Sequence, residues 1–143
     1  MMTNIKHIHK SLEHTYEWIK VLMQDYNFSN ENKAFVVLRA TLKALRDRLP
    51  LNEVVHLGSQ LPVLLRGYYF EGWNPEHEAN EINASHDFVY LVKSHLNGHE
   101  DINLDEAVPA TLKLIFDMID QGEAKEVKAN LPEDLRSYYL KYQ

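Results

Sequence analysis

Apolar residues recur three or four positions apart along almost the whole chain, which is the spacing of one face of an α-helix. One such face covers residues 5–26 and the next covers residues 35–49. Ser29 or Asn30 can cap the start of the second helix, and Pro50 ends it because proline has no backbone N–H to donate. The first face consists of Ile5, Ile8, Leu12, Tyr16, Ile19, Leu22 and Tyr26. The pattern therefore predicts two long amphipathic helices.

Turn-forming residues then divide the next part of the chain into shorter helices. Asn52 can cap a third helix that ends near Gln60. Pro62 suits the first turn of a fourth, because its missing N–H has no helical partner there, and that helix runs toward Phe70. The polar stretch over residues 71–84 contains glycine and proline, which indicates a loop or linker.

Helix-capping and helix-breaking residues divide the last sixty residues in the same way. Ser85 can cap a fifth helix, Asn103 begins a sixth, Gly122 separates a short seventh, and Pro132 opens an eighth. No stretch alternates between apolar and polar residues with a period of two, so we expect no β-sheet. The predicted fold class is all-α, a bundle of about eight helices.

The two halves of the chain also resemble each other in sequence. When residues 37–70 are placed on residues 107–140 without a gap, twelve of the 34 positions are identical. A repeat of this kind indicates a duplicated structural unit. We therefore predict one domain over residues 1–143, built from two tandem four-helix repeats related by pseudo-twofold symmetry. Repeat one covers about 1–73, the linker about 74–84, and repeat two about 85–143.

Residues shared by both copies are expected to build the fold. Asp47 matches Asp117, Glu53 matches Glu123, and Arg66 matches Arg136. We expect Arg66 to pair with Asp47 or Glu53, and Arg136 with Asp117 or Glu123. A cation beside an acid near a helix C-terminus is plausible because the helix dipole disfavours that acid. These pairs would hold each unit together.

Positions that differ between the copies are better candidates for binding. The first copy has Arg46, Arg48 and His56 where the second has Phe116, Met118 and Glu126, and it carries Trp73 beyond an aromatic run. Basic and aromatic side chains together can hold an anionic or nucleotide-like ligand. Exposed aromatic residues would also anchor a partner protein. The alternative, which we favour, is a solvated polar face beside core aromatics. The candidate binding residues are Arg46, Arg48, His56, Tyr69 and Trp73, expected around a groove between the halves.

Composition excludes several classes of protein. The chain has 143 residues, 45% hydrophobic content and no cysteine, so disulfides and thiolate chemistry are ruled out. A formal net charge of −6 makes nucleic acid an unlikely partner, although Arg39, Lys43 and Arg46 form a local basic stripe. No apolar run reaches the length of a membrane span, and the first residues lack a signal-peptide pattern. We expect a soluble, cytoplasmic protein.

Three strings in the first half resemble a known family. They are LRDRL at residues 45–49, SQLP at residues 59–62 and RGYYFEGW at residues 66–73, and Thr15 and Trp18 fit the same pattern. With these motifs the chain resembles the bacterial family catalogued as domain of unknown function 2267, and the second half resembles that family's weaker second copy. The resemblance implies a helical fold and a bacterial source. It brings no established activity and no catalytic residues.

Histidine and acidic residues are the remaining candidates for chemistry. The chain has eight histidines, some at spacings that can bind a metal when further ligands converge. No metalloprotease, phosphate-loop or nucleophile-elbow motif is present in the sequence. We therefore expect no cofactor, no metal ligand and no catalytic residue, and regard surface histidines as the better interpretation. The residues considered are His7, His9, His14, His95 and His99 on helices, and Glu76, His77, Glu78 and Glu81 in the linker.

Two functional classes stay open at this point. The first is a non-catalytic helical interaction or regulatory module with a protein or small-ligand partner, and a homodimer is one form that it can take. The second is a metal-binding protein or metal-dependent hydrolase that uses histidine and glutamate side chains. Bound metal in the purified protein distinguishes them.

Overall fold

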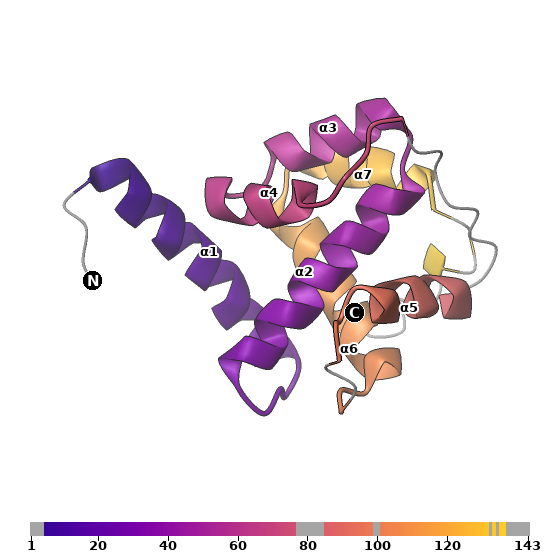
Figure 1. The fold of residues 1–143 in the computed structure, drawn as a ribbon, viewed down its shortest axis with the longest axis horizontal. Coiled ribbons are helices and arrows are strands. Elements are labelled where there is room, and N and C mark those ends of the chain that lie inside the picture. The colour runs from indigo at the N-terminus through magenta and orange to yellow at the C-terminus, as the bar shows by residue number, and fades with distance from the viewer. Residues whose placement is uncertain (1–4, 77–84, 99–100, 132, 134, 137–143) are drawn as a thin grey trace.

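The structure is a computed structural model that describes residues 5–76, 85–98, 101–131, 133, 135 and 136. Within this part of the chain there are seven α-helices and no β-strand, so the predicted all-α fold class is confirmed (Figure 1). The predicted eighth helix falls on residues 132–143, which lie largely outside the described residues. The helices are α1 Lys6–Asp25, α2 Glu31–Arg48, α3 Leu51–Ser59, α4 Val63–Phe70, α5 Ser85–Ser94, α6 Leu104–Met118 and α7 Gln121–Ala129.

Helix starts follow local chemistry that the sequence displays. The side chain of Asn30 accepts a hydrogen bond from the backbone N–H of Lys33 at 3.0 Å and caps α2. Asp120 caps α7 in the same way, by accepting from the N–H of Glu123 at 3.1 Å. Asn103 precedes α6 without forming a side-chain cap. The starts of these helices are therefore set within a few residues of chain.

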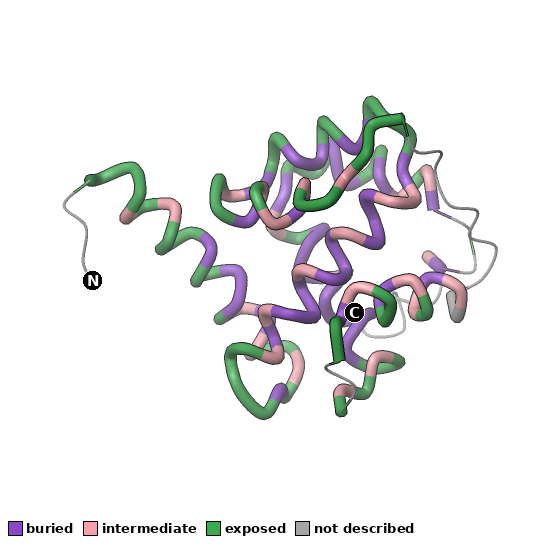
Figure 2. Tube along the Cα trace, viewed as in Figure 1, coloured by how far each residue is buried: buried purple, intermediate pink, exposed green. Residues whose placement is uncertain are grey.

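Helix α2 is the central element of the fold. It packs against α1, α4, α5 and α6, and residues on all its sides are buried, as the tube in Figure 2 shows. Helix α3 lies between α4 and α7 at one end of the molecule. The burial of α2 from four directions explains why its apolar positions exceed the single stripe of a surface helix.

Helix α1 is buried over only part of its length. Its C-terminal half packs Trp18, Ile19 and Leu22 into the core. Its N-terminal half projects from the body of the molecule and is mostly exposed (Figure 2). Among the described helices, none combines the length and the apolar content needed to cross a membrane.

Candidate functional site

Arg46, a predicted binding residue, is buried and bonded to the protein itself. Its guanidinium donates to the carbonyl oxygens of Tyr69 at 3.0 Å and Glu71 at 2.8 Å, and it pairs with the Asp47 carboxylate at 2.9 Å. Only 5% of the side chain is exposed. These bonds fasten the end of α4 to α2. A binding role for Arg46 stays a prediction, and its internal partners favour a structural role.

Asp47 extends this arrangement to the end of α5. Its second carboxylate oxygen lies 2.8 Å from Nε2 of His95. Burial by itself would raise the pKa of Asp47, but the hydrogen bonds and charges of His95 and Arg46 outweigh it and hold the pKa below its usual value. We call Arg46, Asp47 and His95 the Asp47 network. It joins α2 and the end of α4 to the residue that follows α5, so His95 acts here as a partner of Asp47.

The predicted ion pair of Arg66 is wrong. Arg66 donates to the carbonyl oxygens of Gly58, Ser59 and Leu61 at 2.8, 3.3 and 3.1 Å. Carbonyl groups at the C-terminus of a helix have no intrahelical partner, so an arginine one helix later can satisfy them. Arg66 thus caps the C-terminus of α3.

The corresponding pair in the second copy is also different from the prediction. Asp117 binds Lys113, one turn earlier on α6, at 3.1 Å. Among the described residues no ion pair joins Arg136 to Asp117 or Glu123, and the buried Nε of Arg136 has no hydrogen-bond partner there. Asp47 and Asp117 are each bound by a cation nearer in sequence than the prediction assumed.

The aromatic residues after α3 are mostly part of the core. Tyr69 is fully buried, which raises the pKa of its hydroxyl group, and that group donates to the carbonyl oxygen of Val54 at 2.8 Å. The expectation that Tyr69 is exposed is therefore wrong. Phe70 and Trp73 are partly buried and in ring contact with each other. A Cβ atom at Gly58 would lie 2.7 Å from the ring of Phe70, so glycine permits this close packing.

Two of the five predicted binding residues do line a common cavity. A cavity of about 330 Å³ between the end of α2 and the segment after α4 is bordered by Arg46, Asp47, Val54, Trp73 and Pro75, among others. Tyr69 is buried away from it. The cavity thus brings together Arg46 and Trp73, but its lining lies within residues 46–75, so it is not the expected groove between the halves and a binding role for these residues stays a prediction.

The cations of the basic stripe on α2 contact neighbouring side chains of the protein. Lys43 forms an ion pair with Glu71 at 2.8 Å. The guanidinium of Arg39 lies over the rings of Phe35 and Tyr68. Lys43 and Arg39 thus have partners within the protein, and the prediction that nucleic acid is an unlikely partner continues to rest on the net charge.

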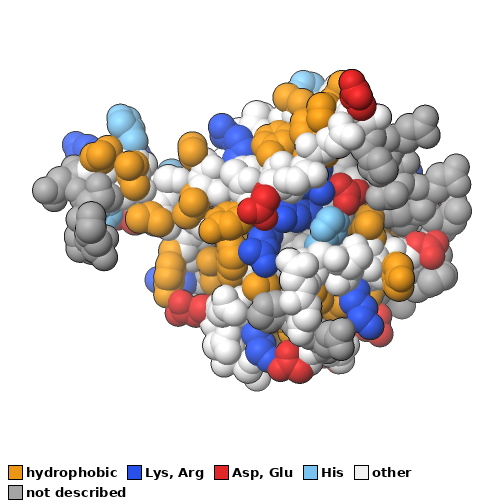
Figure 3. Space-filling view, in the orientation of Figure 1, with side chains coloured by type: hydrophobic (Ala, Val, Ile, Leu, Met, Phe, Trp, Pro, Cys, Tyr) orange, Lys and Arg blue, Asp and Glu red, His pale blue; other side chains and the backbone are white. Residues whose placement is uncertain are grey.

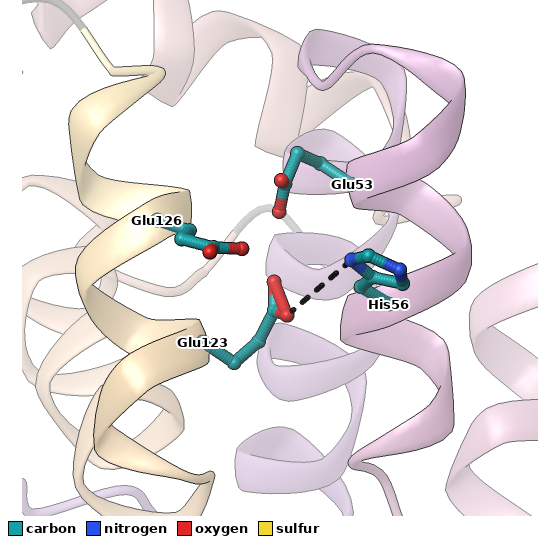
Figure 4. Close-up of side chains that lie close together, drawn as sticks. All are labelled: Glu53, His56, Glu123 and Glu126. Carbon is teal, nitrogen blue, oxygen red and sulfur yellow. Dashed lines mark ion pairs between the residues drawn. The ribbon is translucent and has the colours of Figure 1, made fainter.

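Of the two remaining predicted residues, Arg48 is half-buried at the end of α2, does not border the cavity, and has a buried Nε without a hydrogen-bond partner among the described residues. The other, His56, belongs to a cluster that the sequence analysis did not identify. Glu53 and His56 project from α3, and Glu123 and Glu126 project from α7 toward them (Figure 4). One potential ligand atom from each lies within 4.8 Å of those of the others. Nδ1 of His56 is 3.9 Å from Oε2 of Glu123. We call these four residues the α3–α7 cluster.

Burial makes the α3–α7 cluster electrostatically unusual. Glu53 and Glu123 are only 6% and 9% exposed, and each has one buried carboxylate oxygen without a hydrogen-bond partner. Burial, followed by the nearby Glu53 and Glu126, raises the pKa of Glu123 to about 7. Such a site can hold a proton between carboxylates or a cation.

A signal for this cluster was present in the repeat. Under the shift of seventy residues Glu53 corresponds to Glu123, and His56 corresponds to Glu126. Each pair has i, i+3 spacing, which places both side chains on one helix face. The sequence did not show that α3 packs on α7, which brings the two pairs together.

The metal ligands considered from sequence do not converge in the described structure. His7, His9 and His14 lie along α1, where His9 is 3.9 Å from Glu13. His77, Glu78, Glu81 and His99 lie outside the described residues. Within the described part of the chain, the α3–α7 cluster is the group of three or more such side chains whose ligand atoms come together.

The projecting half of α1 carries a different kind of surface. Three large apolar side chains there, and Tyr16 just beyond it, are about half exposed, with Ile5 at 57% and Tyr16 at 46%, and the hydroxyl group of Tyr16 donates to the carboxylate of Glu31 on α2. Leu64 of α4, also exposed, lies beside them, since its backbone N–H donates to Oγ of Ser11 at 3.0 Å. Figure 3 shows apolar side chains gathered along this arm. We call this surface the outer α1 stripe; its members are Ile5, Ile8, Leu12 and Tyr16.

Comparison with known protein families agrees with the motifs noted in the sequence. No curated protein matches the chain significantly. The profile of a family described as an uncharacterized conserved protein, DUF2267, matches residues 15–138. This match covers α1 from Thr15 onward and every helix that follows it. The chain therefore belongs to the DUF2267 family, whose function is not characterized.

Proposed function

We propose that this protein is a non-catalytic helical interaction module that binds a partner helix along the outer α1 stripe. The proposal rests on the exposure of Ile8, Leu12 and Tyr16, at 49%, 48% and 46%, on a helix that projects from the body of the protein. Contiguous exposed apolar side chains typically mark an interaction site. Burying them against a partner removes apolar surface from water, which favours association.

The spacing of the stripe favours a helix as the partner. Successive apolar positions on this face are three, four and seven residues apart, at Ile5, Ile8, Leu12 and Ile19. This is the a/d spacing of helices packed side by side. Farther along α1 the same face packs against α2 and α6 inside the protein. The outer stripe therefore continues an internal helix–helix interface onto the surface.

The partner that we propose is a second copy of the chain in antiparallel orientation. The charge along α1 changes sign, because Lys6 and Lys10 lie in its first turns and Glu13 and Glu17 follow. Antiparallel pairing places the basic end of one helix along the acidic part of the other, whereas parallel pairing places like charges together. Charge complementarity thus supports self-association through α1.

This proposal is tested by the mass of the protein in solution. Light scattering coupled to gel filtration should give twice the 16.8 kDa chain mass at high concentration and dissociation on dilution. Leu12→Glu should raise the dimer dissociation constant at least about tenfold by burying a charge in the interface. The matched control is Tyr90→Glu on α5, a position 76% exposed and outside the stripe, which should leave the mass unchanged. A wild-type protein that stays monomeric at all concentrations contradicts the proposal.

We also propose that the protein is built from the two tandem units expected from the sequence. Adding seventy to the bounds of α3, 51–59, gives those of α7, 121–129, and the ends of α2 and α6, 48 and 118, correspond in the same way. This agreement supports the duplication. A cytoplasmic location in a bacterial cell remains part of the same proposal.

A further inference from the structure

We infer that the α3–α7 cluster is a binding site for a single divalent transition-metal ion, with Glu53, His56, Glu123 and Glu126 as its ligands. Two helices that are distant in sequence bring these four side chains together at one interface. In Figure 4 the carboxylates and the imidazole point toward a common centre. This site is separate from the outer α1 stripe and does not depend on the proposed function.

The dimensions of the cluster suit one ion. Metal–ligand bonds of about 2.1 Å place ligand atoms about 3.4 Å apart in a tetrahedral zinc site and at most about 4.2 Å apart in an octahedral manganese site. The four candidate atoms already lie within 4.8 Å of one another. Closure around an ion therefore needs side-chain shifts of about 0.5–1.5 Å, which flexible glutamate side chains can make.

The buried oxygens give an independent reason to expect a cation. Oε2 of Glu53 and Oε1 of Glu123 are buried without a hydrogen-bond partner, although both side chains are more than nine-tenths buried. An uncompensated buried carboxylate is costly, because it has lost water and gained nothing in return. A bound cation would satisfy both oxygens at once, and the alternative is a proton shared between Glu53 and Glu123.

The donor set indicates the class of ion. It offers carboxylate oxygens from three residues and one imidazole nitrogen from His56. Calcium prefers six to eight oxygen ligands, and magnesium keeps several waters with few protein ligands. Mixed oxygen and nitrogen ligands suit manganese, iron, cobalt and zinc. We therefore assign the site to an ion of this group.

The exposure of the cluster members provides an entry path. His56 and Glu126 lie on the exposed side, while Glu53 and Glu123 form the buried side. An ion can thus meet the imidazole and one carboxylate first, and then reach the two buried carboxylates. Access without unfolding distinguishes this arrangement from a purely internal ion pair.

Metal titration of the full-length protein tests the inference. Isothermal calorimetry and the electron paramagnetic resonance signal of Mn²⁺ should show one bound ion per chain after chelator treatment. Glu123→Gln keeps the size of the side chain and should weaken Mn²⁺ binding at least about tenfold, and His56→Gln should weaken Zn²⁺ binding more than Mg²⁺ binding.

The matched control is the exposed pair His9 and Glu13 on α1, whose ring nitrogen and carboxylate are also 3.9 Å apart. His9→Gln and Glu13→Gln should leave the stoichiometry and affinity of Mn²⁺ unchanged. Absence of Mn²⁺ and Zn²⁺ binding at millimolar concentrations would overturn the inference, and the cluster would then be a pair of carboxylates sharing a proton. Binding that survives in Glu123→Gln would overturn it as well. Neither result bears on the mass measurement of the proposed dimer.

Discussion

The Asp47 network and the α3–α7 cluster both contain acidic side chains at helix interfaces, but their surroundings are opposite. Asp47 has Arg46 on one side and His95 on the other, and its pKa is lowered. Glu123 faces Glu53 and Glu126, and its pKa is raised to about 7. The difference shows that a buried carboxylate stabilises this fold only where a cation lies beside it.

The Asp47 network is thus complete within the chain, whereas the α3–α7 cluster leaves carboxylate oxygens that a bound ion could satisfy. In the Asp47 network every carboxylate oxygen has a partner from the protein. In the α3–α7 cluster two buried oxygens have none. This contrast separates a structural role from a candidate ligand site more clearly than residue type does.

The largest effect should come from removing the cation of the complete network. Arg46→Met should lower the free energy of unfolding by about 3 kcal/mol, because Asp47 and two carbonyl groups lose their buried partner. Urea unfolding followed by circular dichroism measures this change. Arg48→Met, two residues along the same helix, is the control and should cost less than about 1 kcal/mol. Equal losses for the two variants would contradict the structural role of Arg46.

The next effect is smaller, and here a substitution should raise the free energy of unfolding of the metal-free protein instead of lowering it. It concerns Glu123 in the α3–α7 cluster and depends on pH. The pKa of Glu123 is about 7 in the folded protein and 4.5 as its ordinary value. Its contribution to stability is therefore fully present below about pH 4.5 and is lost as pH rises through 7.

Glu123→Gln should remove this dependence and stabilise the metal-free protein by about 1–2 kcal/mol at pH 8, since relaxation and water reduce the full effect of the shift. Unfolding curves of both proteins at intervals between pH 5 and pH 8 provide the measurement. Parallel curves for wild type and variant across this range would show that Glu123 does not titrate there.

The smallest effect should come from the second partner of Asp47. His95→Ala should cost about 1 kcal/mol, because it removes one hydrogen bond to a carboxylate that Arg46 continues to compensate. The melting temperature should fall by a few degrees, whereas His14→Ala, at an exposed position of α1, should leave it unchanged. A loss as large as that of Arg46→Met would mean that His95 and not Arg46 is the main counter-charge.

Much of the fold could be predicted because its determinants are local. Apolar spacing indicated every helix in the described part of the chain, and Pro50, Pro62 and Asn30 lie at helix starts where sequence placed a boundary. Trp73 and Arg46 were selected because they differ between the two copies; they border one cavity, although it lies within residues 46–75 and not between the halves.

The errors concern residues whose partners are distant in sequence. Arg66 binds carbonyl oxygens of a neighbouring helix instead of an acid. Tyr69 is buried because α3 covers it, which its own helix pattern could not show. The α3–α7 cluster was missed for the same reason, although its four positions are related by the repeat.

By itself the amino-acid sequence determined the helical class, most helix boundaries, the similarity of the two halves and the family. These properties follow from hydrogen bonding and side-chain spacing within a few residues of chain. Only the tertiary structure decided which buried acids have a cation beside them and which do not. That outcome depends on which helix faces meet, and burial makes each such meeting strongly stabilising or strongly costly.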